Sequence, residues 1–274
     1  MRRRFVGVSA ALAPYVDRIW SWEGRAEELP TVFPGTGAEL VIQRGAGIVA
    51  HTASGPYRLP EAHLLCLRRT RWRLAAAGPV AFTAVRLRAG ALAALCPVPT
   101  TVIADQAVAA ADVFGAAADR LVAAVRAGGT LAERAARIES VLVRTLDSAA
   151  PPDRRVAAAV ARIYRDPATA RVNQIGPGVG LSARHLRRGF LTTVGVPPKE
   201  FQQLARFQRV VRTLLLSESQ AHLAVALSAG YYDQSHYIKD VRRLTGARPT
   251  ELLAGSVPHF YYPSLSRRGG SPFE

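Results

Sequence analysis

The feature that most constrains this sequence is an internal repeat, at an offset of 51 residues, within its C-terminal half. Residues 182–190, SARHLRRGF, match residues 233–241, DQSHYIKDV. The register then continues, with a Gly, a Pro and a Glu at equivalent positions in both copies. A chain that repeats such a segment is expected to form the same small structural unit twice.

Each copy carries the signals of a capped helix. Ser182 and Asp233 are residue types that accept hydrogen bonds from the first free N–H groups of a helix. Gly195 and Gly246 stand where such a helix would end in a left-handed cap. Between these ends, apolar residues four positions apart predict one buried stripe on each helix. In the second copy, Leu244 is a further residue expected to be buried. The predicted buried residues are Leu186, Phe190, Tyr237, Val241 and Leu244.

A shorter helical segment and a glycine turn precede each capped helix. These leading segments are Val172–Ile175 and His222–Ala229. A helix, a glycine turn and a second capped helix form the helix-turn-helix pattern. The sequence therefore predicts two such units, with second helices over about 183–193 and 234–245.

One long helix, Pro198–Ser217, is predicted between the two units because apolar residues follow a broad helical face. Its 20 residues would span about 30 Å. That length suits two helices that enter successive major grooves, which are about 34 Å apart. In the first unit, Gly176-Pro177-Gly178 is expected to interrupt the leading helix, because an interior proline costs about 3 kcal/mol. The first unit is therefore expected to be short, shifted or mobile.

Residues from about 154 to 254 resemble the DNA-binding domain of the AraC/XylS family. The segment Gly230–Tyr237, followed by Gly246–Pro249, is similar to that family's signature. The front of the chain resembles the N-terminal domain of one subgroup of this family over residues 12–20, 33–42 and 85–91. The resemblance implies a transcription regulator, often an activator, whose N-terminal domain senses a ligand or pairs subunits.

The resemblance also implies which side chains contact DNA. On the two predicted second helices these are Arg184, Arg187, Arg188, Gln234, Ser235, His236 and Lys239. Arginine can form two hydrogen bonds with guanine O6 and N7, and glutamine can pair with adenine N6 and N7. Outside a repeated motif, the same residues would form an ordinary solvated helix face. His185 and His236 recur in register, which indicates a fixed local role, such as a capping or phosphate hydrogen bond, and favours a structural one.

The N-terminal residues show a different pattern of apolar residues from the C-terminal half. The chain as a whole is predicted to be α+β. Short apolar or alternating stretches separated by Gly and Pro predict a strand-rich region. Those stretches are Ile19–Trp22, Leu40–Gln43, Ile48–His51, Leu64–Leu67, Trp72–Ala75 and Val80–Leu87. Two amphipathic helices are expected to follow, around residues 121–125 and 131–146. We expect an N-terminal sensor or dimerisation domain over 1–150, a linker at Pro151-Pro152-Asp153, a DNA-binding domain over 154–254 and a loosely ordered tail over 255–274.

Charge supports a polyanionic partner, which we expect to be double-stranded DNA. The sequence has 36 basic and 20 acidic residues, a net charge of +16. Residues 1–150 hold 18 basic and 12 acidic side chains, whereas the shorter remainder holds 18 and 8. A coding bias explains arginine in place of lysine but not the shortage of acids. The excess therefore favours nucleic acid, with the site in the C-terminal part.

Several classes of function are disfavoured by the sequence. Cys66 and Cys96 are too few and too isolated for a zinc cluster, and neither a metal nor a cofactor is expected. No apolar run reaches the roughly 18 residues of a membrane span, so a cytoplasmic protein without a membrane partner is expected. No motif pairs a nucleophile with a base, which argues against an enzyme. The sequence also lacks the cysteines that a DNA-repair enzyme of the zinc-dependent kind, fused to a DNA-binding module, would need.

The sequence alone leaves the effector site and the sequence preference of DNA binding open. The effector site is unknown; Glu39 is the candidate, since a carboxylate in an apolar strand either pairs with an arginine or meets a ligand. A small-molecule effector, RNA polymerase and a second copy of the chain are the further expected partners. The rival interpretation is an architectural protein that binds DNA without sequence preference, which would not need exposed Gln and Ser at base-reading positions.

Overall fold

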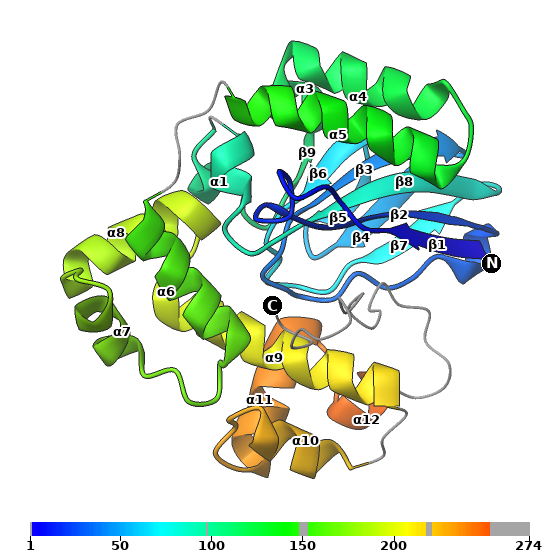
Figure 1. The fold of residues 1–274 in the computed structure, drawn as a ribbon. Helices are drawn as coiled ribbons and strands as arrows, with labels where there is room; N and C mark the ends of the chain where they lie inside the picture. Colours follow the sequence, from blue (N-terminus) through cyan, green and yellow to red (C-terminus); the bar gives the residue numbers. More distant parts are fainter. Residues whose placement is uncertain (1, 97, 148–152, 218–220, 253–274) are drawn as a thin grey trace.

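The computed structural model describes residues 2–96, 98–147, 153–217 and 221–252. Figure 1 shows a part built of sheets and helices, formed by the first half of the chain, beside an all-helical part formed by the second half. The predicted α+β class is confirmed. The described part of the chain contains no helix with both the length and the apolar character that a bilayer crossing requires.

Two antiparallel sheets form the N-terminal part. The larger has the strand order β1-β2-β8-β3-β6-β9 and the smaller β5-β4-β7. The strands of the larger sheet are β1 (Arg2–Val6), β2 (Val16–Gly24), β3 (Glu39–Gly45), β6 (Ala62–Leu65), β8 (Val80–Leu87) and β9 (Ala107–Ala109). Those of the smaller are β4 (Ile48–Thr52), β5 (Gly55–Arg58) and β7 (Arg73–Ala76). Each predicted strand is found, and β1, β5 and β9 are additional.

The larger sheet is covered on both faces, which explains why its central strands are so apolar. On β3, Leu40 and Ile42 point into a core shared with helices, whereas Val41 points into a core shared with the smaller sheet. Trp20, Trp22 and Trp72 fill this second core. Alternate side chains therefore enter different cores, and a continuous apolar run is the expected sequence for such a strand.

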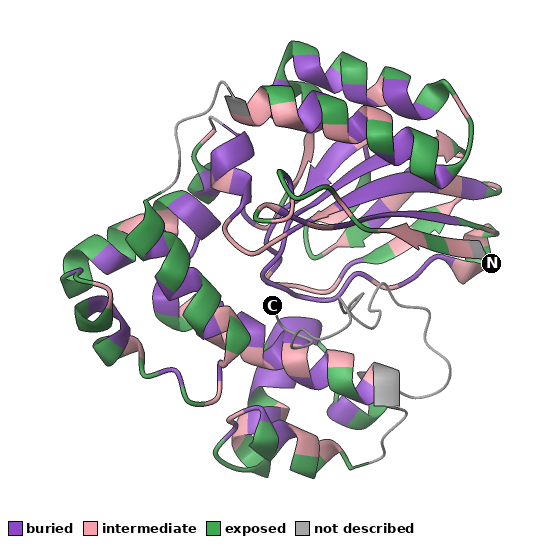
Figure 2. Ribbon diagram, viewed as in Figure 1, coloured by how far each residue is buried: buried purple, intermediate pink, exposed green. Residues whose placement is uncertain are grey.

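Short and long helices cover the outer face of the larger sheet. They are α1 (Leu92–Leu95), α2 (Thr100–Ile103), α3 (Ala110–Phe114), α4 (Ala116–Arg126) and α5 (Leu131–Asp147). The short helix η1 (Ala26–Glu28) follows β2. Figure 2 shows buried residues on the inner sides of α4 and α5 and exposed residues on their outer sides. The two predicted amphipathic helices are thus confirmed as α4 and α5.

The C-terminal part consists of helices around one core. They are α6 (Arg154–Arg165), α7 (Val172–Gly178), α8 (Ala183–Val194), α9 (Pro198–Ser217), α10 (His222–Ser228), α11 (Gln234–Thr245) and α12 (Pro249–Leu252). The long helix α9 has the predicted bounds, and α8 and α11 are the predicted second helices. Residues 151 and 152 of the expected linker, and the expected tail over 255–274, lie outside the described residues.

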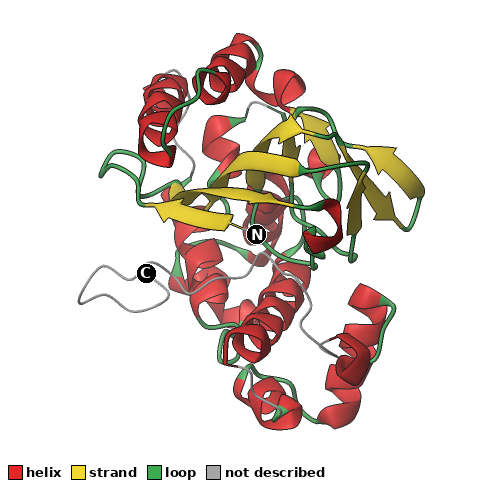
Figure 3. Cartoon of the chain, turned by 90° about the vertical axis from the view of Figure 1, so that its right-hand side faces the viewer, coloured by secondary structure: helices red, strands yellow, loops and turns green. Residues whose placement is uncertain are grey.

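The two parts contact each other directly. Phe33 and Leu67, from the N-terminal part, belong to the core of the C-terminal helices. In Figure 3 the helices of the C-terminal part lie beneath the strands. Consequently the N-terminal part is well placed to influence the helices that carry the candidate site.

Candidate nucleic-acid interface

Both second helices begin and end as the sequence predicts. At α8, the Ser182 hydroxyl accepts a hydrogen bond from the His185 N–H at 3.3 Å. At α11, the Asp233 carboxylate accepts one from the His236 N–H at 2.7 Å. Gly195 and Gly246 close the helices with φ values of 83° and 69°. These φ values lie in the left-handed region, where glycine is the favoured residue.

The two recurring histidines strengthen the same caps. His185 Nδ1 lies 2.9 Å from the Ser182 hydroxyl. His236 Nδ1 accepts a hydrogen bond from the Tyr232 N–H at 3.4 Å, and its ring meets Tyr231 edge-on at 5.1 Å. Both rings therefore act at the start of their own helix, which agrees with the structural role favoured from the sequence.

The buried stripes hold α8 and α11 in place. Leu186, Phe190, Tyr237, Val241 and Leu244 are all buried, as predicted. Phe190 meets Phe201 of α9 edge-on at 5.7 Å between ring centroids. Tyr237 meets Tyr231 in the same way at 5.3 Å. The orientation of each second helix is thereby fixed by aromatic packing behind it.

The opposite faces of α8 and α11 are open to solvent. Of the seven residues proposed for DNA contact, all are exposed except His236, which is half-buried. The three arginines lie on α8, and the mixed polar set lies on α11. Within the described ranges, Arg184, Arg187, Arg188 and Lys239 form no ion pair with a carboxylate. Their charges remain available to a polyanion.

The expected interruption of the first leading helix is wrong. Helix α7 runs through Gly176-Pro177-Gly178 and is as long as α10. Pro177 lies in the last turn, and the acceptor that its missing N–H would have reached is the carbonyl of Asn173, an exposed residue. Gly176 fits this turn because a Cβ there would lie 2.8 Å from the carbonyl oxygen of Leu181. The two units therefore have equivalent leading helices.

Matched hydrogen bonds show where the two units differ. The Leu181 N–H donates to the Gly176 carbonyl at 2.8 Å, and the Tyr231 N–H donates to the Ala226 carbonyl at 3.1 Å. These turns are 50 residues apart, whereas the caps are 51 apart. The additional residue is Tyr232, which is 88% exposed. Tyr232 is not among the residues expected to contact DNA from the sequence, although the change in offset is visible there.

The C-terminal end of α8 is held by the N-terminal part. The Thr100 hydroxyl lies 2.9 Å from the Leu191 carbonyl oxygen and 2.8 Å from that of Thr192, two acceptors that the helix leaves free. A Cβ at Gly195 would lie 2.6 Å from the Thr100 carbonyl oxygen, so only glycine permits this approach. Helices α1 and α2 both pack against α8. The position of α8 thus depends on the N-terminal part.

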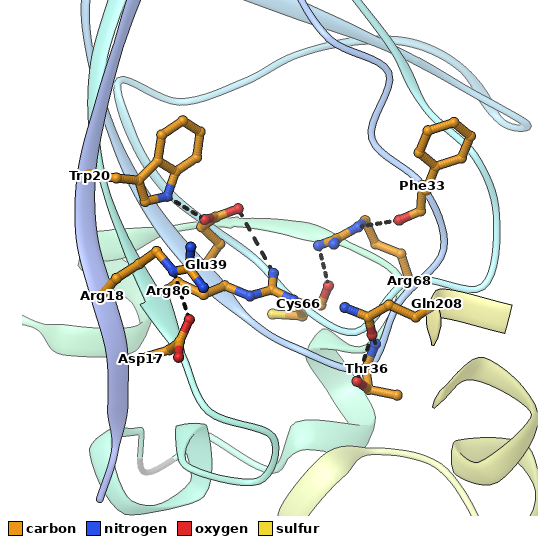
Figure 4. Close-up of polar contacts among 10 residues, drawn as sticks. All are labelled: Asp17, Arg18, Trp20, Phe33, Thr36, Glu39, Cys66, Arg68, Arg86 and Gln208. Atoms are coloured by element: carbon orange, nitrogen blue, oxygen red, sulfur yellow. Dashed lines mark hydrogen bonds and ion pairs between the residues drawn. The ribbon is translucent and has the colours of Figure 1, made fainter. Parts of the chain in front are cut away.

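Helix α9 makes further polar contacts with the N-terminal part. The buried Gln208 amide oxygen accepts from the Thr36 N–H at 3.1 Å and from its hydroxyl at 2.9 Å (Figure 4). Arg69 donates to the Glu200 carboxylate at 2.5 Å. Glu200 on α9 thus pairs with Arg69, and Arg209 on the same helix lies 3.8 Å from Asp166.

Glu39 has structural partners in the N-terminal part. Its carboxylate accepts a hydrogen bond from Trp20 Nε1 at 2.7 Å and lies 3.9 Å from Arg86 (Figure 4). The buried carboxylate is therefore paired, as the structural alternative required. A ligand role for Glu39 would need these bonds to be exchanged.

A small, partly open cavity lies where the two parts meet. Its lining includes Cys66 and Ile103 from the N-terminal part and Thr193 and Val194 from the end of α8. Arg88 also contributes, and its Nε donates to the Ala13 carbonyl at 2.6 Å. The cavity is mostly apolar and touches the same end of α8 that Thr100 caps.

No group of three or more His, Cys, Asp or Glu side chains in the described residues is placed to hold a metal ion. Both cysteines are free and buried. Burial raises the pKa of the Cys66 thiol to about 12, so it is poorly suited to nucleophilic chemistry. These cysteines act as small apolar residues in the packing.

Comparisons with known proteins agree with the geometry. Residues 178–255 match a family described as a helix-turn-helix domain, and residues 8–109 match a domain of unknown function, DUF6597. A comparison with curated proteins finds no match. A structure of ToxT from Vibrio cholerae aligns at 11% identity with a TM-score of 0.51, covering 86% of this chain and 99% of that one. A second, from strain O395, aligns at 10% identity and 0.50, covering 86% and 98%. At such identities the likeness concerns the fold.

Proposed function

This chain is a member of the AraC/XylS family by its C-terminal helix-turn-helix domain, and on this premise we propose that it is a sequence-specific regulator of transcription. It inserts α8 and α11 into successive major grooves of double-stranded DNA. Residues 154–254 form the DNA-binding domain in this proposal, and residues 1–150 form the regulatory domain.

The observation that carries the proposal is the pair of matched, capped helices at the two ends of α9. Their apolar stripes are buried and their polar faces are open, which is the arrangement that a groove-binding helix needs. Helix α9 has 20 residues, or about 30 Å, which is close to one turn of the DNA double helix. Both helices can therefore reach the same face of a duplex.

In this proposal α8 and α11 have different roles in DNA binding because their exposed side chains differ. Arg184, Arg187 and Arg188 on α8 bind phosphates and guanines. On α11, Gln234, Ser235, His236 and Lys239 read or border the base edges, and Gln234 carries most of the specificity. Tyr232, exposed just before α11, lies where a phenolic hydroxyl can donate to a phosphate.

We assign the N-terminal domain to control of DNA binding, through a small effector, a second copy of the chain, or both. The cavity at the end of α8 supports an effector, because a molecule bound there would touch the helix that contacts DNA. We further propose that the protein works in the cytoplasm as an activator that contacts RNA polymerase.

Selection of binding sites from random duplexes, followed by footprinting, tests the DNA-binding proposal. We expect an enriched site with two half-contacts about one helical turn apart. The architectural alternative predicts uniform binding and no enriched sequence. Enrichment of nothing, despite tight and salt-sensitive binding, would overturn sequence-specific regulation in favour of that alternative.

Sedimentation and a thermal-shift screen of small metabolites test the regulatory assignment. We expect either a dimer or a ligand that raises the melting temperature of the full chain. A monomer that responds to none of a broad panel would contradict this role for the N-terminal domain, while leaving the DNA-binding proposal intact.

A further inference from the structure

A polar cluster interrupts the helix-facing side of the larger sheet near its β1 edge. Val6 on β1 and Ile19 on β2 face the helices, so Arg4, opposite Ser21 and two residues from Val6, faces them too. The same row continues to Thr83 on β8, which lies opposite Ser21. Polar side chains thus replace the apolar ones along this row.

Arg44 lies on the same face and belongs to the neighbouring row. On β3, Ile42 lies opposite Thr83 of β8. Arg44, two residues further along β3, points to the same side of the sheet as Ile42. Neighbours in adjacent rows of one sheet face are within reach of a long side chain. Thr83 is fully buried and Arg44 is half-buried. The sheet therefore presents a hydroxyl and two guanidinium groups toward the helix layer.

Helix α5, which packs on this face of the sheet, contributes another guanidinium group to the cluster. The helix packs against β1 and β2 and lies across the sheet in Figure 1. Arg134, in its first turns, is only 7% exposed. Its Nη1 donates to the Gly129 carbonyl at 2.5 Å, and its Nε faces the interior.

These donors lack partners among the residues that the structure describes. Arg134 Nε, Arg44 Nε and the Thr83 hydroxyl are buried and make no hydrogen bond to any described residue. Burial lowers the pKa of Arg134, and repulsion by Arg44, Arg137 and Arg4 lowers it further, whereas Glu23 alone raises it. Like charges therefore surround the buried Arg134, with Arg44 half-buried and Arg4 exposed at the rim of the cluster.

We propose that this cluster, formed by Arg4, Thr83, Arg44 and Arg134, is a binding site for a small oxyanion. Glu23, two residues from Ser21 on the same face, is one acid beside several guanidinium groups. A buried cation with more positive than negative charge around it is unfavourable, and a bound anion would supply the missing negative charge. Guanidinium groups match the paired oxygens of phosphate, sulfate and carboxylates, and the threonine hydroxyl adds a further donor. The site lies in the N-terminal part, on other elements than the DNA-contacting helices, and is independent of the proposed function.

Thermal unfolding of the full chain in rising inorganic phosphate, at constant ionic strength, tests the proposal. The wild-type melting temperature should rise with phosphate, because a ligand that binds only the folded state stabilises it. Arg44→Met and Arg134→Met should lose most of this rise. Arg120→Met on α4 is the matched control, since it removes an equal charge from an exposed position and should keep the rise. Without phosphate, Arg134→Met should melt no lower than the wild type.

Parallel titrations with sulfate and acetate identify which oxyanion class the site prefers. Phosphate that binds the arginines of α8 would shift all four proteins equally, so the difference between the site variants and the control is the decisive quantity. An equal shift in all of them would overturn the proposal. If Arg134→Met does not fold, Arg44→Met and calorimetric titration of the wild type with phosphate give the same decision.

Discussion

Gln234 and Arg188 are both exposed on second helices, but they can do different things on DNA. The Gln234 amide can make two hydrogen bonds to one base, and each such contact discriminates by about 1–3 kcal/mol. Replacing it in Gln234→Ala should therefore reduce the preference for the selected site. Binding to scrambled duplexes should hardly change. Competition binding on both duplexes measures this ratio.

Arg188→Ala is the matched comparison on α8. A lost phosphate contact weakens binding to all sequences and lowers the slope of log affinity against log salt by about one. We expect the affinities for specific and scrambled duplexes to fall together across a salt series. An intact specificity ratio in Gln234→Ala would show that α11 does not read bases in the major groove.

Tyr237 separates packing from hydrogen bonding at a single position. The ring is 2% exposed, and its hydroxyl makes no hydrogen bond to a described residue. Tyr237→Ala should lose about 3–5 kcal/mol of unfolding free energy, as large buried aromatic residues do. Tyr237→Phe should cost nothing or stabilise, since an unpaired buried hydroxyl is unfavourable. Denaturant unfolding of both variants checks the pair, and similar losses in the two would contradict the assigned buried face.

Among the elements, β6 gives the larger sheet a dependence on pH. His63 on β6 is 1% exposed, and burial lowers its pKa to about 4 from the usual 6.5. Between these values the unfolded chain binds a proton that the folded chain does not. Stability from the neutral ring is thus complete above about pH 6.5 and falls by about 3 kcal/mol as the pH drops toward 4.

His63→Gln should remove this part of the pH dependence while keeping a donor for the Pro60 carbonyl, which His63 Nδ1 approaches at 2.7 Å. Unfolding free energies of wild type and variant, measured from pH 7.5 to 4, give the comparison. The wild type should lose more stability than His63→Gln over this range. Parallel curves would mean that His63 titrates normally in the folded chain.

The helical elements were the most predictable from sequence because their signals are local. Pro198 marks the start of α9, and glycine caps mark the ends of α8 and α11. Strand β3 was also predictable from its apolar run. Strand β1 was missed, since its RRRFV sequence resembles a charged terminus and its pairing with β2 is a tertiary property.

In the candidate interface, the caps and the buried stripes followed from residue type and spacing. The effect of Gly176-Pro177-Gly178 was misjudged because α7 is so short that Pro177 falls in its last turn. The contact of Thr100 with the end of α8 joins residues about 90 positions apart, as the 2.9 Å bond to Leu191 illustrates. No local pattern in a single sequence indicates such a contact.

At the scale of the whole molecule, the N-terminal and C-terminal parts share an interface. Phe33 and Leu67 complete the core of the C-terminal helices. Gln208 on α9 is buried against Thr36 of the N-terminal part. These contacts determine what the C-terminal part would lose if it were separated.

A fragment of residues 150–274 should fold and bind DNA, because both units and their stripes lie within it. It should melt at a lower temperature than the full chain, since the sites of Phe33 and Leu67 become exposed and the cap from Thr100 is lost. In the full chain, Thr100→Val removes only that cap and should cost about 1 kcal/mol. Calorimetry and DNA binding of both proteins check these expectations. An insoluble or non-binding fragment, beside an active full chain, would place the boundary of the DNA-binding domain elsewhere.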